Sequence, residues 1–229
     1  MPPEFEVRPA AQDWTGDGHR FGILFVCTAN LCRSVIAEWT ARQCLTRYPA
    51  AEASFAVASA GTSANAGTPV PVATADLLTS MGAAPGLPRP GVPVAQGGLE
   101  LVTSRQLAAT DLDQAALVLT AQREHLHESL MLAPGASRRC FLLLEFARLA
   151  PAGLAAAGPQ TDPVARARDV VAATARARGQ GRYVDPDDDE IADPVRSADL
   201  YRCAAVIGAA VSASIAALCR AESPVRRGE

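Results

Sequence analysis

Two side chains that phosphate chemistry uses, a cysteine and an arginine, lie close together at Cys27 and Arg33. A cysteine thiolate is a nucleophile, and the planar guanidinium of arginine can bind two phosphate oxygens at once. The residues between them are mainly small or polar and indicate a loop, and Ser34 follows directly. A thiolate beside a bound phosphate is placed for in-line attack on phosphorus, which gives a phosphocysteine intermediate.

The segments on either side of this loop strengthen the interpretation. Residues 21–26 form a nearly continuous apolar run, typical of a strand buried on both faces, and a helical pattern begins at Ser34. Loop amides between a parallel strand and a helix can point into one concavity, and the helix N-terminus adds positive potential. This setting favours a phosphate and would stabilise a thiolate at Cys27. The Cys-x5-Arg spacing alone is weak evidence, so the strand and the helix carry the inference.

Apolar runs alternate with helical patterns along the chain and predict an α/β fold. We expect a four-stranded parallel sheet flanked by helices on both faces, with the phosphate-binding loop after the first strand. The predicted strands are 21–26, 55–59, 115–120 and 140–144, and the predicted helices are 34–48, 69–81, 121–130 and 197–220.

We predict one domain over residues 21–222, with a flexible leader at 1–20 and a flexible tail at 223–229. Residues 150–184 are rich in Ala, Arg and Gly and are interpreted as an insertion, with a helix starting near Asp162 and Pro163. We expect this insertion to be neutral decoration rather than a cover for the active site. The acidic run 187–190 is expected to be a solvated loop.

Composition excludes several other chemistries. All 21 basic residues are arginine, so no Schiff-base or Walker-type lysine exists. The six cysteines form no CxxC pair and only three histidines accompany them, so we expect no metal site, and no cofactor is expected. A net charge of −3 gives no sign of a nucleic-acid partner.

The N-terminal residues are polar and contain no apolar signal core, which favours reduced thiols and a cytoplasmic location. No apolar run reaches about 18 residues, so we expect no membrane span and no membrane partner. The oligomeric state is left open by the sequence.

The segment ILFVCTANLCRS resembles the phosphate-binding loop of the low-molecular-weight protein-tyrosine phosphatases. The similarity continues through residues 57–62, 117–120 and 144–146 and through Asp193-Pro194, and it covers most of 21–150 and 185–220. The resemblance implies that Cys27 is the nucleophile and Arg33 the phosphate clamp, without a metal. The rest of the implied phosphate-binding loop is Thr28, Ala29, Asn30, Leu31, Cys32 and Ser34.

The family also implies supporting roles around the nucleophile. Asn30 would hold the loop conformation with help from Ser59, and Ser34 would hydrogen-bond the thiolate and ease its departure. Cys32 resembles the neighbouring cysteine that can form a reversible disulfide with the nucleophile, here Cys27, under oxidation.

Cleavage of a phosphate ester also needs an acid for the leaving oxygen and then a base for water. Three Asp-Pro pairs compete for this role, at Asp162, Asp185 and Asp193. The family places its acid in an Asp-Pro loop just before the final helix, which favours Asp193. Any of the three could instead be an ordinary turn or capping aspartate.

The sequence departs from the family pattern at a few positions. Ala29 and Val35 stand where the family usually has Gly and Pro, and alanine at a tight loop position would be strained if its φ were positive. Val195 and Arg196 follow Asp193-Pro194, where the family commonly has an aromatic residue that packs against phosphotyrosine. These last two residues bear on the preference for tyrosine and leave the phosphate chemistry intact.

The sequence therefore predicts hydrolysis of phosphomonoesters, with a phosphotyrosine protein as substrate and a bacterial tyrosine kinase as a partner that the resemblance suggests. An arsenate reductase on the same fold is one alternative, but residues 83–113 lack the resolving cysteine that it needs. A module that binds phosphorylated ligands without turnover is another. A Cys–His hydrolase would pair Cys27 with His125 or His127, which we expect to be exposed on a helix.

Overall fold

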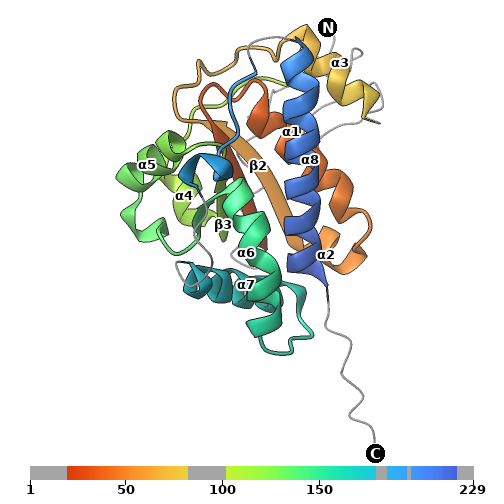
Figure 1. The fold of residues 1–229 in the computed structure, drawn as a ribbon, viewed down its shortest axis with the longest axis vertical. Coiled ribbons are helices and arrows are strands. Elements are labelled where there is room, and N and C mark those ends of the chain that lie inside the picture. The colour runs from red at the N-terminus through yellow and green to blue at the C-terminus, as the bar shows by residue number, and fades with distance from the viewer. Residues whose placement is uncertain (1–19, 82–101, 179–184, 195–196, 221–229) are drawn as a thin grey trace, which may run out of the picture.

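The computed structural model describes residues 20–81, 102–178, 185–194 and 197–220, and Figure 1 shows their arrangement. The predicted leader and tail lie outside these residues, apart from Arg20. The strands are β1 (Phe21–Cys27), β2 (Phe55–Gly61), β3 (Leu117–Thr120) and β4 (Cys140–Leu142). They pair in parallel in the order β2-β1-β3-β4, which confirms the predicted four-stranded parallel sheet.

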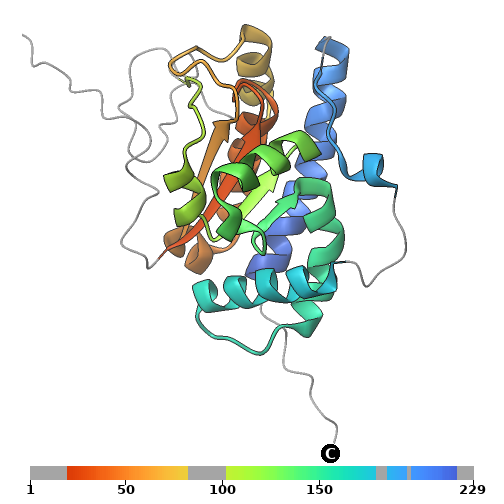
Figure 2. The same cartoon turned by 90° about the vertical axis from the view of Figure 1, so that its left-hand side faces the viewer.

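The helices of the described residues cover both faces of the sheet (Figures 1 and 2). They are α1 (Arg33–Leu45), α2 (Pro49–Ser54), α3 (Val72–Ser80), α4 (Ala109–Gln114), α5 (Arg123–Leu132), α6 (Leu143–Ala156), α7 (Pro163–Ala177) and α8 (Ser197–Cys219), with short 3₁₀ helices at η2 (Pro134–Ala136) and η3 (Pro186–Asp189). Sequence patterns did not predict the short helices α2 and α4. They have six residues each, too few to show an amphipathic period.

Strand residues point alternately into two apolar clusters, as the pleat of a strand requires. In β1, Ile23 and Phe25 belong to the cluster under α1, α6 and α8, whereas Leu24 and Val26 belong to the cluster under α4 and α5. All seven residues of β1 are buried, which explains why its sequence is apolar without alternation. β1 is thus the central strand that carries the phosphate-binding loop at its carboxyl end.

The prediction that the fourth strand runs to residue 144 was wrong, because α6 begins at Leu143. The carboxylate of Glu145 accepts a hydrogen bond from the backbone N–H of Leu142 at 3.3 Å, which caps the new helix. Arg178 pairs with the same carboxylate at 2.7 Å and stacks over the ring of Phe141, 4.0 Å from its centroid. The apolar sequence hides the boundary because both segments are buried.

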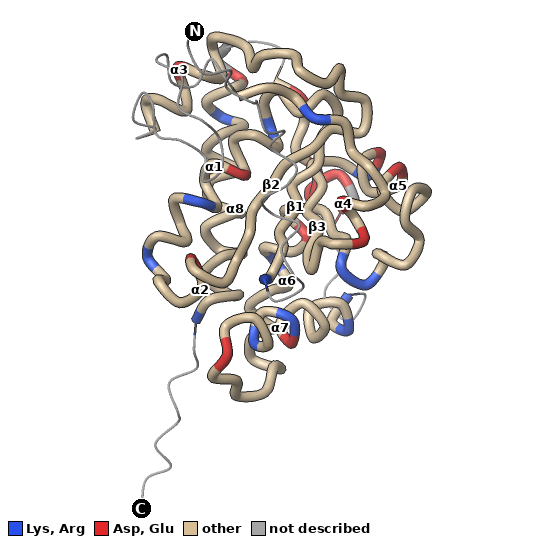
Figure 3. The backbone as a smooth tube through the Cα atoms, turned by 180° about the vertical axis from the view of Figure 1, so that it is seen from behind, with Lys and Arg blue, Asp and Glu red and all other residues tan. Residues whose placement is uncertain are grey.

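The predicted insertion contains the end of α6 and the whole of α7, and α7 begins at Pro163 with Asp162 as its N-cap. α7 packs against α6, α8, α2 and the start of β1, so it closes the end of the sheet opposite the phosphate-binding loop (Figure 2). Charged residues of both signs lie along it (Figure 3). A Cβ on Gly153 of α6 would lie 2.1 Å from Oγ1 of Thr174, so the two helices approach closely there. The segment therefore packs into the core, at the end of the sheet away from the predicted site, and the expectation that it does not cover the site stays a prediction.

Helix α8 is long and apolar enough over Asp199–Cys219 to cross a bilayer, by length and composition alone. The expectation from apolar runs overlooked it, because polar residues interrupt the runs without lowering the average hydropathy far. Just over half of that window, 56%, is buried inside the molecule, against α1 and α6. A core helix of a folded protein passes the same test, and α8 is placed as one.

Candidate active site

The phosphate-binding loop, residues 27–34, lies at the switch point of the sheet, between β1 and β3. From β1 the chain continues to β2 on one side, and from β3 it continues to β4 on the other, so the loops after β1 and β3 diverge. Such a switch point leaves a crevice at the carboxyl ends of the two strands. The loop after β3 contributes Gln122, whose Oε1 lies 2.5 Å from Nη1 of Arg33. The topology therefore brings two loops together around the predicted site.

The backbone at the start of the loop is oriented by hydrogen bonds to the chain that follows β2. The carbonyls of Cys27 and Thr28 accept hydrogen bonds from the N–H groups of Thr62 and Ser63, both at 2.9 Å. Carbonyl and N–H of a trans peptide point in opposite directions, so the amides of Thr28 and Ala29 point away from the chain that follows β2. Amides directed to one side in this way form an anion-binding concavity.

Gly61, the last residue of β2, lies directly against this loop. A Cβ at Gly61 would be 2.4 Å from the carbonyl oxygen of Thr28 and 2.8 Å from the amide nitrogen of Asn30. Both contacts are with backbone, which cannot rotate out of the way as a flexible side chain can. Glycine is therefore required where β2 meets the phosphate-binding loop.

Asn30 supports the loop with its backbone and its side chain together. Its φ is 55°, the only positive φ outside glycine among the described residues, and asparagine tolerates this conformation better than most residues. Its Nδ2 donates to Ser34 and to Ser59, each at 2.9 Å, and its Oδ1 accepts from the amide of Arg105 at 2.8 Å. Ala29 does not have a positive φ, so the strain that we considered there does not arise.

The hydrogen-bond roles fix the direction of the contact between Ser34 and Cys27. Asn30 Nδ2 can only donate, so Oγ of Ser34 accepts that bond and keeps its own proton free. The sulfur of Cys27 lies 3.0 Å from this hydroxyl oxygen and is its available acceptor. Cys27 is only 3% exposed, so a donor beside the sulfur stabilises negative charge where water hardly reaches.

Buried polar side chains continue this network behind the loop. Ser59 accepts from Asn30 and donates to the carboxylate of Glu38 at 2.6 Å. Glu38 is 3% exposed and is paired with Arg42 at 2.9 Å, and Arg42 also donates to the carbonyl of Val57 in β2. The loop conformation is thus tied to helix α1 and strand β2 through charged groups that the sequence analysis did not identify.

The guanidinium of Arg33 is almost fully buried and is surrounded by acceptors. Nη1 donates to Gln122 and to the carbonyl of Ile191 at 3.0 Å. Nη2 donates to Oγ1 of Thr28 and lies 3.1 Å from Oδ1 of Asp193. Four groups from three separate loops therefore hold one cation in place.

The third donor of Arg33 has a different environment. Among the described residues, no acceptor bonds its Nε, although this nitrogen is buried. An unsatisfied buried donor costs free energy, and a phosphate oxygen is an acceptor that would satisfy it. The donor set therefore fits a bound phosphate.

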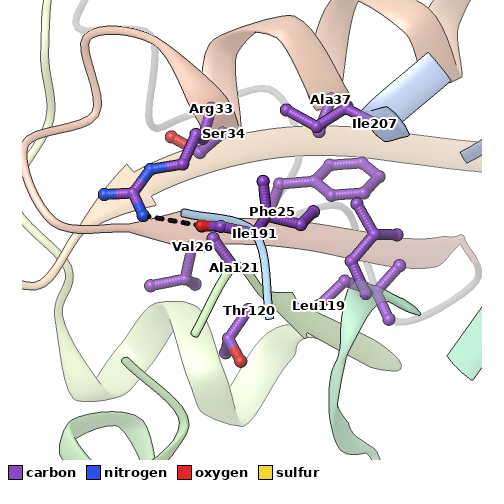
Figure 4. A pocket seen from close by; sticks show the side chains of 11 residues that line it. Phe25, Val26, Arg33, Ser34, Ala37, Leu119, Thr120, Ala121, Ile191 and Ile207 are labelled. Atoms are coloured by element: carbon purple, nitrogen blue, oxygen red, sulfur yellow. Dashed lines mark hydrogen bonds between the residues drawn. The ribbon is translucent and has the colours of Figure 1, made fainter. Parts of the chain in front are cut away.

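A cavity of about 10 Å³ lies on the inner side of Arg33 and Ser34 (Figure 4). Figure 4 shows the guanidinium directed to the carbonyl oxygen of Ile191, with the hydrogen bond between them as a dashed line. This volume has room for one water molecule at most, so it cannot hold a phosphate. Its other lining residues are mainly apolar: Phe25, Val26, Ala37, Leu119, Thr120, Ala121, Leu143 and Ile207.

The three candidate acids lie in three different environments. The carboxylate of Asp162 caps α7, accepting from the amide of Ala165 at 2.7 Å, at the end of the sheet away from the loop. Asp185 accepts from the amide of Asp187 at 3.1 Å and caps η3. Asp193 alone of the three contacts Arg33, and its side chain is 69% exposed at the mouth of the site.

The acidic segment before Asp193 is not the solvated loop that we expected. We call residues 185–194 the acid loop. Asp189 is buried and paired with Arg148 of α6 at 2.6 Å. The carboxylate of Glu190 accepts from the amide of Arg123 at 3.2 Å. Within the acidic run 187–190, only Asp187 and Asp188 are exposed, so half of that run is anchored to the rest of the molecule.

His125 was expected to be exposed and is instead 1% exposed, whereas His127 is exposed as expected. Its Nδ1 accepts the backbone N–H of Gln122 at 3.1 Å, so its proton is on Nε2, which donates to Oγ1 of Thr28 at 2.8 Å. Burial and the positive charge of Arg33 lower the pKa of His125 to about 4. The ring is therefore neutral at physiological pH and its contact is with Thr28, which argues against a Cys–His pair.

The thiols near the site differ from one another in their surroundings. Burial raises the pKa of Cys32 to about 12 and that of Cys203 to about 11, so both are neutral at physiological pH. Cys140 is fully buried in β4 and cannot act as a mobile resolving thiol. All six cysteines are unpaired, and within the described residues no cluster of three or more His, Cys, Asp or Glu could hold a metal ion.

The sequence analysis did not identify Gln122 or Glu38, named His125 only for the alternative Cys–His hydrolase, and placed Glu190 in a solvated run, although all four touch the site or its support. Only Glu38 and Arg42 carried a local signal, because they are four apart in a helical pattern. The others contact residues more than 60 positions away in the chain, and no local pattern predicts such contacts.

The family model of the low molecular weight phosphotyrosine protein phosphatases matches residues 22–155, more than half of the chain. No curated protein matches the chain.

Solved structures share the fold at low sequence identity. The YwlE arginine phosphatase of Geobacillus stearothermophilus superposes with a TM-score of 0.54 at 19% identity, over 85% of this chain and 90% of that one. Wzb of Vibrio vulnificus, solved with benzylphosphonate, gives 0.53 at 20% identity, over 86% and 97%. The Erwinia amylovora tyrosine phosphatase AmsI gives 0.56 at 17% identity, over 94% and 100%. With the family match over β1, the phosphate-binding loop and the rest of the sheet, the chain belongs to the low molecular weight phosphotyrosine protein phosphatase family.

Proposed function

We propose that this protein hydrolyses phosphomonoesters through a phosphocysteine intermediate and that its substrate is phosphotyrosine in proteins. One observation carries the proposal: the sulfur of Cys27 lies 3.0 Å from the Ser34 hydroxyl in a loop that also holds Arg33, and Arg33 is paired with Asp193. A nucleophile, a cation for the phosphate and a proton donor for the leaving group are the parts that this reaction needs.

In the first step, the thiolate of Cys27 attacks phosphorus and the bond from phosphorus to the leaving oxygen breaks. The carboxyl group of Asp193 gives its proton to that oxygen, so the alcohol leaves neutral. Arg33 and the amides of the phosphate-binding loop bind the phosphoryl oxygens, with Nε of Arg33 as a donor that is still free.

In the second step, the carboxylate of Asp193 takes a proton from water and the water oxygen attacks phosphorus. The bond between phosphorus and sulfur breaks, which returns the thiolate of Cys27 and inorganic phosphate. The Ser34 hydroxyl stabilises the departing sulfur, while Asn30 and Ser59 keep this hydroxyl in place.

The remaining loop residues have simpler proposed roles. Thr28, Ala29, Leu31 and Cys32 contribute backbone amides to the phosphate site, since these positions form the curve of the loop. The Cys32 thiol is held neutral by burial, so it does not compete with Cys27 as a nucleophile. No metal or other cofactor takes part in the proposed reaction.

Phosphotyrosine is proposed as the substrate because of the family match and the tyrosine phosphatases among the structural neighbours. Val195 and Arg196, which replace the expected aromatic residue, lie outside the described residues. One neighbour is an arginine phosphatase, so phosphoarginine is the natural competitor in an assay. We further propose a cytoplasmic enzyme with a bacterial tyrosine kinase as a partner.

Release of phosphate from p-nitrophenyl phosphate tests the proposal. The wild-type protein is expected to turn over and to be inhibited by vanadate, whereas Cys27→Ser should show no turnover and retain phosphate binding. Cys32→Ser is the matched control, because it changes a thiol in the same loop, and most of the activity should remain. Wild-type protein that binds phosphate without turnover would support a binding module instead.

The substrate class needs a second comparison. Peptides that carry phosphotyrosine, phosphoserine or phosphoarginine should be ranked by kcat/KM, with phosphotyrosine expected to be the best of the three. A preference for phosphoarginine would keep the proposed chemistry and replace the proposed substrate.

A further inference from the structure

The acid loop is docked onto the loop that follows β3 by its backbone at Ile191. The amide of Ile191 donates to the carbonyl of Ala121 at 2.8 Å, and its carbonyl accepts from Nη1 of Arg33 at 3.0 Å. Ile191 is 4% exposed and lies two residues before Asp193. The position of the Asp193 carboxylate is therefore set by how firmly the chain is held at residues 190 and 191.

The side chain of Glu190 provides a second attachment beside Ile191. Its Oε1 accepts the amide N–H of Arg123 at 3.2 Å and lies 3.5 Å from Nε of the same arginine. Its Oε2 accepts from Nε2 of Gln122 at 3.4 Å. One carboxylate thus binds two consecutive residues at the start of α5, where the helix N-terminus also favours negative charge.

Gln122 connects this attachment with the cation of the phosphate site. Its Oε1 accepts from Nη1 of Arg33 at 2.5 Å, and its Nε2 donates to Glu190. An arginine can only donate and a carboxylate can only accept, so the orientation of the Gln122 amide is determined by its two neighbours. Glutamine, which has a donor and an acceptor on one group, suits this position between opposite charges.

We propose that Gln122 and Glu190 form a latch that holds the acid loop against the phosphate-binding loop. The latch makes both residues positioning residues for the proton transfer by Asp193, with Gln122 linking Glu190 to Arg33. This inference rests on the proposed function and adds two residues that neither the sequence pattern nor the family match identifies. The family match ends at residue 155, before Glu190.

Glu190 and Asp189 are adjacent and have separate tasks in this arrangement. Asp189 ties the loop to Arg148 on the outer surface of α6, with contacts at 2.6 Å and 3.3 Å. Glu190 ties it to Gln122 and therefore to the guanidinium of the site. Loss of Glu190 should move the acid, while the pairing of Asp189 with Arg148 keeps the loop folded.

Displacement of the acid should lower the rate most for substrates whose leaving group must be protonated. The dinitrophenolate of 2,4-dinitrophenyl phosphate is a weak base and leaves without a proton, whereas the phenolate of phenyl phosphate needs one. Displacement by about 1 Å can cost up to about a hundredfold in rate. We expect Glu190→Ala to lower kcat/KM for phenyl phosphate by about tenfold or more and that for dinitrophenyl phosphate by less than about threefold.

The inhibition constant of inorganic phosphate separates the two residues of the latch. Glu190→Ala should leave this constant within about twofold of wild type, because Glu190 does not touch Arg33. Gln122→Ala should weaken phosphate binding as well, because it removes an acceptor of the guanidinium. Glu190→Gln retains an oxygen for the Arg123 amide and should restore part of the lost rate.

The matched control is Asp188→Asn, which removes one negative charge from an exposed position of the same loop. It should leave kcat/KM unchanged for both aryl phosphates. Hydrogen exchange at the Ile191 amide gives a readout independent of turnover, and Glu190→Ala should speed it. If the wild type is active and Glu190→Ala lowers kcat/KM equally for both aryl phosphates, or for neither, the latch is overturned and the proposed function stands. An inactive wild type would overturn the proposed function, and the latch with it.

Discussion

The two ends of the sheet differ in the side chains that fill them. At the amino end of the strands, α7 packs through small apolar residues, and Gly153 allows its close contact with Thr174. At the carboxyl end, the interior is polar: Asn30, Arg33 and Glu38 are each no more than 3% exposed. The amino end is stabilised by close packing of apolar side chains, and the carboxyl end by hydrogen bonds with defined donors and acceptors.

This difference separates what stabilises the molecule from what the site can do. Apolar packing depends on volume and tolerates any side chain that fits, so the amino end can change sequence without loss of chemistry. A buried polar network depends on the role of every atom, and a single wrong group leaves a partner unsatisfied. We therefore expect mutations at the carboxyl end to affect turnover and those at the amino end to affect stability.

The largest effect is expected from Asp193→Ala. Loss of the general acid should lower kcat/KM for phenyl phosphate by about 10²- to 10³-fold, measured by steady-state kinetics. Asp185→Ala and Asp162→Ala are the matched controls, since both carboxylates cap other elements. Asp162→Ala should cost about 1 kcal/mol of stability through the lost cap and leave the rate unchanged. An unchanged rate in Asp193→Ala would show that the acid is a different residue.

Gly61→Ala tests the backbone contact under the phosphate-binding loop. The new methyl group would displace the backbone at Thr28 and Asn30, so kcat/KM should fall by about ten- to a hundredfold and vanadate should bind more weakly. Gly135→Ala is the control, because a Cβ there meets open space. Wild-type kinetics for Gly61→Ala would show that the loop can accommodate a methyl group at residue 61, contrary to these distances.

Gly153→Ala tests the opposite end. Overpacking against Thr174 should lower the free energy of unfolding by about 1–3 kcal/mol, measured by denaturant titration, with kcat/KM of the folded protein unchanged. Gly208→Ala in α8 adds the same methyl group where space is open and should stabilise by about 0.5–1 kcal/mol. A loss of activity without a loss of stability in Gly153→Ala would break the separation between the two ends.

The smallest effect on turnover is expected from His125, whose titration should appear only as a pH dependence of stability. The pKa of its ring is about 4 in the folded protein, below the ordinary 6.5, so between these values only the unfolded chain takes up the proton. Stability should therefore fall as pH drops from 6.5 to 4, by about 2 kcal/mol at pH 5. His125→Gln should reduce this loss, and the exposed His127→Gln should not. Equal pH profiles for the wild type and His125→Gln would contradict the buried neutral ring.

The order of strands and helices could be predicted from the sequence because each buried strand is a continuous apolar run. β1 and the phosphate-binding loop could be recognised because the chemistry there depends on residues close together in the chain. The boundary between β4 and α6 could not, since Leu142 and Leu143 are both buried and only the cap at Glu145 separates them.

The parts of the site that were missed depend on contacts between distant segments. Histidine and glutamate are residue types usually found at the surface. His125 is buried and Glu190 is paired because the loop after β3 lies against the phosphate-binding loop and the acid loop. The role of α7 was hidden for the same reason, because an Ala- and Arg-rich sequence shows an apolar face only once the start of β1 lies beneath it.

The central claim is that Cys27 becomes phosphorylated during turnover. Rapid acid quenching of the reaction with phosphotyrosine peptide, followed by mass spectrometry of the digested protein, tests this directly. The phosphoryl group should be found on the peptide that contains Cys27, on its sulfur, and should be absent from Cys27→Ser. A phosphoryl group on Cys32 or on Asp193, or turnover with no phosphoryl-enzyme at any quench time, would contradict the account.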